Sequence, residues 1–248
     1  MEIVILTALG VGGATVFGAS FGLIFRKTGK VFNDLAMSLA AGVMLAAAVL
    51  GLILPSLEYG GRFAVIITVS GIFVGALCVN LLDFLMLSAF DTHFAENKSA
   101  PSERVRRVIL FVSAISIHNL PEGIAAGVGF GGENISDGIF IATAIALQNI
   151  PEGIAVVVAM LGIGIKSYRS FLIAALTGLV EIIGTVIGYF AVNISLGFLP
   201  FMLAFAGGNM LYVIADEMIP DTRSEGGPIT TYLVLLGFSL MLILNEII

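Results

Sequence analysis

Eight apolar stretches fill most of this 248-residue chain, and they restrict its fold more than any other feature. They cover residues 3–25, 35–54, 63–82, 108–130, 138–165, 170–193, 197–215 and 228–245. Each has about the 17 to 25 residues, or slightly more, that a helix needs to cross the hydrocarbon of a bilayer. Because lipid cannot satisfy exposed backbone polar groups, a helix is expected for each stretch. We therefore predict an all-α membrane protein with eight transmembrane helices in a single domain, residues 1–248.

The basic residues predict how these helices are oriented. All Lys and Arg residues except Arg62 fall in the connections after the first, third, fifth and seventh stretches. Such residues concentrate in the cytoplasmic connections of membrane proteins. We therefore expect a multi-pass protein of the cell membrane, embedded in the lipid bilayer, with both termini outside the cytoplasm.

Charge, cysteine content and glycine spacing limit the partners. The formal net charge is -6 and no basic run could follow a nucleic acid backbone, so no nucleic acid partner is expected. The single cysteine, Cys78, excludes an intrachain disulfide and a thiolate metal cluster. Three pairs of glycines four residues apart favour close helix packing, with a homodimer interface as the second interpretation. They are Gly18 and Gly22, Gly71 and Gly75, and Gly184 and Gly188.

Two polar octets interrupt the apolar stretches. Residues 118–125 read His-Asn-Leu-Pro-Glu-Gly-Ile-Ala, and residues 148–155 read Gln-Asn-Ile-Pro-Glu-Gly-Ile-Ala. Their helices should run antiparallel with both octets near the bilayer midplane, as in an inverted repeat. Residues three and four apart share a helix face. The polar residues of each octet therefore gather on one face: His118, Asn119 and Glu122 in the first, and Gln148, Asn149 and Glu152 in the second.

Three carboxylates are expected near mid-membrane depth, those of Glu122, Glu152 and Glu181. A charge there costs on the order of 2.5 to 3.5 kcal/mol on insertion scales. Every Lys and Arg lies in a connection or at a helix end, so the compensating charge must come from protons or a bound cation. With the two asparagines, Gln148 and His118, the carboxylates supply oxygen and nitrogen donors for one or two divalent metal ions. The alternative is that these groups only hold kinked helices together, with the carboxyls protonated by burial.

Four further residues are weaker candidates. Met44 reaches a similar depth in the second stretch, although a methionine alone is more typical of a core than of a metal site. Glu58 follows the outer end of that stretch, and Asp216 and Glu217 end the seventh stretch at the inner side. These carboxylates could hold cations at an entrance and an exit, but they are also ordinary residues of a membrane interface.

The longest connection, residues 88–107, follows the third stretch. It contains Asp91, His93 and Glu96 in a spacing that could bind a metal on an extended segment, although a solvated loop is the simpler interpretation. Asp83, at the cytoplasmic end of the third stretch, receives no role.

The octets resemble the signature of the ZIP (Zrt/Irt-like) family of divalent metal transporters, HNxPEG followed by [HQ][ND]xPEG. The resemblance covers the whole chain and is closest to the short prokaryotic, GufA-like members, in which a similar methionine precedes a Pro-x-x-acid ending, here Met44 and Pro55 to Glu58. It implies a bundle with inverted repeats, in which helices 1 to 3 and 6 to 8 are related around helices 4 and 5.

The resemblance also implies roles for the candidate residues. The seven polar residues of mid-membrane depth would form a two-metal centre: His118, Asn119, Glu122, Gln148, Asn149, Glu152 and Glu181. Met44 would contact the primary metal, Glu58 would lie near the entrance, and Asp216 with Glu217 would form the exit pair. Gln148 replaces the histidine of many members and Asn149 the aspartate of some, which weakens the preference for Zn²⁺.

The expected function is transport of divalent transition-metal ions into the cytoplasm, with Zn²⁺ first and Fe²⁺, Mn²⁺ or Cd²⁺ as further substrates. The metal is substrate, and neither a catalytic cofactor nor enzyme activity is expected. An intramembrane metalloprotease would need an HExxH-type helix or its reverse, which the sequence lacks. A metal-sensing or proton-conducting membrane protein without net metal flux remains the alternative.

Overall fold

The computed structural model describes residues 2–24, 30–96, 103–131, 135–194, 196–220 and 227–247. Within these ranges the chain is helical and contains no strand. Eight of the helices described there are long and apolar enough to cross a membrane. The predicted all-α fold with eight membrane-spanning helices is therefore confirmed.

A helix lies over each predicted stretch, and several helices extend beyond its bounds. They are α1 (Glu2–Ile24), α2 (Lys30–Ala46), α3 (Leu54–Tyr59), α4 (Ala64–Glu96), α5 (Glu103–Val128), α6 (Ile135–Gly162), α7 (Ser167–Ile194), α8 (Leu199–Val213) and α10 (Pro228–Ile247). The second span is continuous, because the π-helical segment η1 (Ala47–Ile53) joins α2 to α3. A second π-helical segment, η5 (Ile214–Met218), extends α8. A proline follows each segment, Pro55 or Pro220, and its missing N–H loosens the regular hydrogen-bond ladder.

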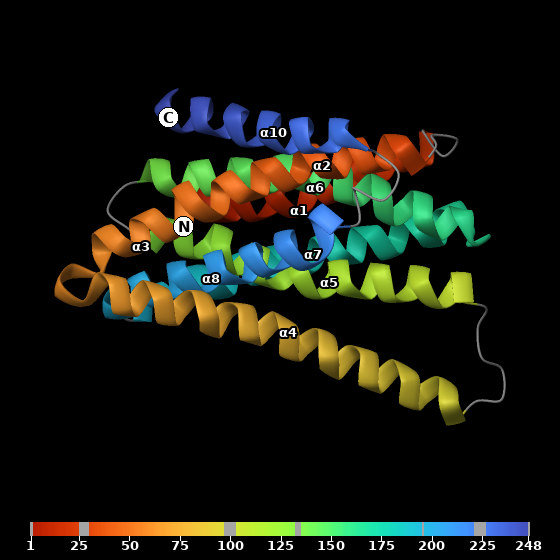
Figure 1. The fold of residues 1–248 in the computed structure, drawn as a ribbon, viewed down its shortest axis with the longest axis horizontal. Coiled ribbons are helices and arrows are strands. Elements are labelled where there is room, and N and C mark those ends of the chain that lie inside the picture. The colour runs from red at the N-terminus through yellow and green to blue at the C-terminus, as the bar shows by residue number, and fades with distance from the viewer. Residues whose placement is uncertain are drawn as a thin grey trace.

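The predicted start of a long connection at residue 88 is wrong, because α4 continues to Glu96. An apolar stretch marks where a chain lies in lipid, whereas a helix ends where a breaker or a cap stops it. Residues 83–96 contain neither glycine nor proline, so the helix runs on after its apolar part. This end of α4 diverges from the other helices (Figure 1). The side chains of Asp91, His93 and Glu96 lie outside the described residues.

The helices form two groups. In one group, α1 packs against α6 and α7, and α5 packs against α7. In the other, α4 packs against α8, and α2 against α10. The groups meet where α2 contacts α6 and where α5 contacts α8. The start of α1 and the end of α10 lie at the same end of the bundle (Figure 1).

Close glycine contacts relate the two halves of the chain. Gly18 and Gly22 of α1 face Ile150 and Ile154 of α6, while Gly184 and Gly188 of α7 face Leu120 and Ile124 of α5. Each α7 glycine lies 166 positions after its α1 counterpart. Shifting η1 by the same interval gives residues 213–219, a range that contains η5. These repeated contacts support the predicted inverted repeat. The glycine pairs serve packing inside one chain, and the homodimer prediction stays untested.

Candidate metal centre

The two octets lie inside α5 and α6, and neither proline ends its helix. Proline is tolerated inside transmembrane helices because neighbouring groups satisfy the backbone atoms that it frees. All seven polar residues predicted at this depth are buried: His118, Asn119, Glu122, Gln148, Asn149, Glu152 and Glu181. The structure therefore places the predicted ligands inside the protein rather than against lipid.

Glu181 of α7 is the point where four helices meet. Its Oε1 accepts hydrogen bonds from the amide of Asn119 in α5 and, at 2.9 Å, from the hydroxyl of Thr15 in α1. Its Oε2 accepts one from Asn149 Nδ2 of α6 at 2.6 Å. The same nitrogen donates to the carbonyl of Val11 at 3.1 Å. One carboxylate thus holds both octet asparagines by their nitrogen atoms.

A second contact joins the two octets directly. Gln148 Nε2 donates to Glu122 Oε1 at 2.7 Å. The amide nitrogens of this region are therefore turned toward carboxylates, which is the pairing that their charges favour. The contact also leaves the carbonyl oxygen of Gln148 and the second oxygen of Glu122 outside that hydrogen bond.

Four buried oxygens of the centre accept no hydrogen bond from the residues that the structure describes: Asn119 Oδ1, Glu122 Oε2, Gln148 Oε1 and Asn149 Oδ1. Burying an acceptor without a donor is costly. Carboxylate and amide oxygens are ligands that divalent cations take readily. Within the described ranges, no three His, Cys, Asp or Glu side chains form a metal-binding group by themselves. A bound ion would therefore need the amide oxygens as well.

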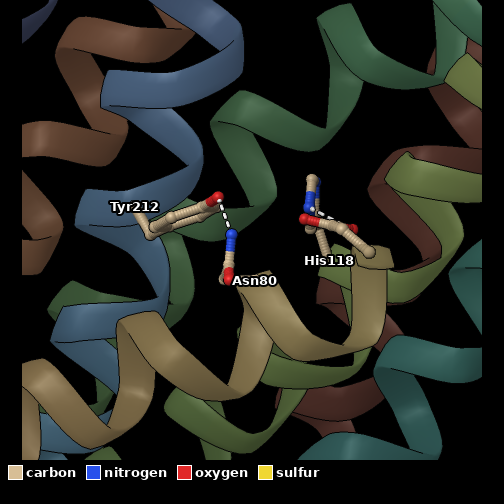
Figure 2. A network of polar contacts seen from close by, with 4 residues as sticks. Asn80, His118 and Tyr212 are labelled. Carbon is tan, nitrogen blue, oxygen red and sulfur yellow. Dashed lines mark hydrogen bonds and ion pairs between the residues drawn. The ribbon is translucent and has the colours of Figure 1, made fainter. Parts of the chain in front are cut away.

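His118 lies beside an acidic residue that the sequence left without a role. Its Nε2 is 3.8 Å from Oδ1 of Asp83 in α4. Three residues earlier in α4, Asn80 donates to the hydroxyl of Tyr212 in α8 at 2.7 Å. Figure 2 shows that pair next to His118. These contacts connect α4 to both neighbouring helices at the level of the first octet.

Met44 is fully buried in an apolar cluster. The cluster includes Ala125, the last residue of the first octet, and Ile145, one turn before the second. Met44 therefore lies in the core, and its contact with a metal stays a prediction.

The predicted entrance and exit residues lie apart from the centre. Glu58 is exposed in α3, where the neighbouring Tyr59 donates to Asp137 at 3.5 Å. Asp216 is exposed in η5, and the side chain of Glu217 lies outside the described residues. Their positions at span ends fit an ion entrance and exit, and they also fit ordinary residues of a membrane interface. Their roles therefore stay predictions.

Known proteins are similar to this chain over almost its whole length. The family model described as ZIP Zinc transporter matches residues 95–245. The chain is 32% identical to the zinc transporter GufA of Myxococcus xanthus over 97% of both chains. This chain belongs to the ZIP family.

Two other relatives are similar over almost the whole chain. Identity is 36% to the zinc transporter ZIPB of Bordetella bronchiseptica, over 94% of this chain and 77% of the relative. It is 32% to the human zinc transporter ZIP11, over 94% and 93%. Together with GufA, they confirm the predicted GufA-like type and a multi-pass membrane protein. The family and these relatives are transporters rather than enzymes.

Sequence reasoning missed two side chains that contact the candidate centre: Thr15, which bonds to Glu181, and Asp83, which lies beside His118. Threonine is common in helices, and an acidic residue at a span end is ordinary, so neither stands out by type. A comparison of the two halves would have indicated Thr15, because it precedes Glu181 by the 166 positions that relate α1 to α7. No comparable signal indicates Asp83.

Proposed function

We propose that this ZIP-family chain carries divalent transition-metal ions across the cell membrane into the cytoplasm, with Zn²⁺ as the main substrate. Fe²⁺, Mn²⁺ and Cd²⁺ are the further candidates. The observation that carries the proposal is the set of four buried acceptor oxygens without donors among the described residues, at mid-span in α5 and α6. The relatives support it, because GufA, ZIPB and ZIP11 are each named zinc transporters.

We assign the seven buried polar residues of α5, α6 and α7 as ligands of one or two ions in this centre: His118, Asn119, Glu122, Gln148, Asn149, Glu152 and Glu181. The carboxylates offset the charge of the ion, and the amide oxygens replace its water. Carboxylates attract any cation, so the choice among metals rests on the imidazole of His118 and on Met44, if its sulfur reaches the ion. Release also requires that this binding stay weak enough for the ion to leave.

The charge asymmetry of the connections assigns the orientation of the chain in the membrane. Both termini are assigned to the outer side, because nearly all Lys and Arg residues lie in the connections of the opposite side. Glu58 is then near the outer entrance, and Asp216 with Glu217 near the cytoplasmic exit. Their carboxylates would raise the local cation concentration at both ends of the path.

Metal uptake into proteoliposomes tests the proposal. Zn²⁺, Fe²⁺, Mn²⁺ and Cd²⁺ are offered to the wild type, to Glu122→Gln and to Glu152→Gln, at matched protein insertion. Glu246→Gln, an exposed glutamate near the end of α10, is the control. We expect saturable uptake by the wild type and the control, and its loss in both centre variants because each removes a buried negative charge. Tight Zn²⁺ binding without flux of any ion would indicate a metal sensor rather than a transporter. Proton flux without metal flux would indicate a proton conductor.

A further inference from the structure

Thr15 of α1 and Glu181 of α7 occupy corresponding places in the two halves of the protein. They are 166 positions apart, the interval that also separates the paired glycines of these helices. A Cβ on Gly153 of the second octet would lie 2.2 Å from the carbonyl oxygen of Thr15. A Cβ on Gly123 of the first octet would lie 2.3 Å from the carbonyl oxygen of Glu181. Each octet therefore packs on one of these two residues in the same way.

The hydroxyl of Thr15 makes an unusual hydrogen bond for a helical threonine. Such hydroxyls generally bond to a carbonyl one turn back in their own helix. Thr177 and Thr185 do so in α7, with hydrogen bonds of 2.9 Å to Ala174 and Glu181 carbonyls. Thr15 instead donates to the Glu181 carboxylate of another helix, and both residues are fully buried. The hydroxyl is thus used to hold that carboxylate.

Holding Glu181 fixes the orientation of the two octet asparagines. Its oxygens accept from Asn119 and Asn149 as well as from Thr15. The nitrogen and the oxygen of a side-chain amide point in different directions. An asparagine that donates its nitrogen to Glu181 therefore points its carbonyl oxygen away from that carboxylate. Both of these oxygens are buried and lack a donor among the described residues. They are the oxygens that a cation in the centre would take.

We propose that Thr15 is a positioning residue of the metal centre, which sets how strongly the centre binds ions that prefer oxygen ligands. It acts through Glu181, which presents the carbonyl oxygens of Asn119 and Asn149. The inference rests on the proposed function, because it concerns the same centre. Mn²⁺ prefers oxygen ligands, whereas Zn²⁺ also takes the nitrogen of His118. Loss of the hydroxyl should therefore weaken Mn²⁺ binding more than Zn²⁺ binding.

Equilibrium binding of Zn²⁺ and of Mn²⁺ to the purified full-length chain tests this role. We expect Thr15→Val to weaken Mn²⁺ binding about tenfold, the effect of one hydrogen bond to a charged group, and to weaken Zn²⁺ binding less. Thr15→Ser keeps the hydroxyl and should bind both ions as the wild type does. Thr177→Val is the matched control, because it removes a buried hydroxyl from α7 that does not contact the carboxylate.

A double-mutant cycle separates positioning from a general loss of structure. In the Glu181→Gln background, Thr15→Val should change the ratio of Mn²⁺ to Zn²⁺ affinity little further, because the carboxylate through which it acts is gone. An unchanged ratio in Thr15→Val, or an equal change in Thr177→Val, would overturn the role of Thr15 alone. A wild type that binds neither ion would overturn the proposed function together with this inference.

Discussion

The contact of α1 with the second octet leaves no room for a methyl group at Gly18. A Cβ at this position would lie 2.1 Å from the carbonyl oxygen of Ile150, whereas ordinary contacts begin at 3.4 Å. Gly18→Ala must therefore move α1 away from α6 by about 1.3 Å at this level. Ile150 stands within the second octet, between Asn149 and Glu152. The substitution consequently acts on the metal centre although Gly18 carries no side chain.

The displacement is large compared with what the centre tolerates. It would stretch the hydrogen bonds by which α1 holds its partners, at 2.9 Å from Thr15 to Glu181 and at 3.1 Å from Asn149 to Val11. Metal–ligand distances in proteins stay within about 0.2 Å of their preferred values. We expect Gly18→Ala to lower the free energy of unfolding by about 1 to 3 kcal/mol, the usual cost of overpacking, and to weaken Zn²⁺ binding at least about tenfold.

Gly10→Ala and Gly13→Ala are matched controls for this experiment. Both glycines lie in α1, and a Cβ on either would meet nothing within 4 Å. Unfolding in detergent micelles and Zn²⁺ binding would be measured for all three variants. Wild-type stability and Zn²⁺ affinity in Gly18→Ala, or equal damage in the two controls, would refute the predicted displacement of α1.

Two side chains near the first octet give further predictions. Asp83→Asn should weaken Zn²⁺ binding by about 10- to 100-fold, because it removes the charge 3.8 Å from the ring of His118 that helps to orient it. Competition titration with a Zn²⁺ chelator measures this, and an unchanged affinity would exclude a role for the pair. Gln148→His should raise the preference for Zn²⁺ over Mn²⁺ in binding, since it adds a second imidazole. Equal changes for the two ions would contradict that explanation.

Several parts of the fold and centre could be predicted because they depend on short segments. About 20 apolar residues suffice to define a span, so all eight spans were found, although the helical extent of α4 was not. Helical spacing alone places the polar residues of each octet on one face. The absence of Lys and Arg from the predicted apolar stretches indicates that Glu122, Glu152 and Glu181 need protons or a cation.

Only the tertiary structure decided which polar atoms meet. Thr15 and Glu181 are 166 positions apart, and their contact depends on how far α1 and α7 are rotated and shifted relative to each other. Close glycine contacts fix that placement, since an added Cβ would overlap the facing backbone. The same holds for Asp83 and His118, which lie in different helices, α4 and α5. The amino-acid sequence by itself determined which residues lie in the membrane, whereas helix packing determined which of them share a hydrogen bond.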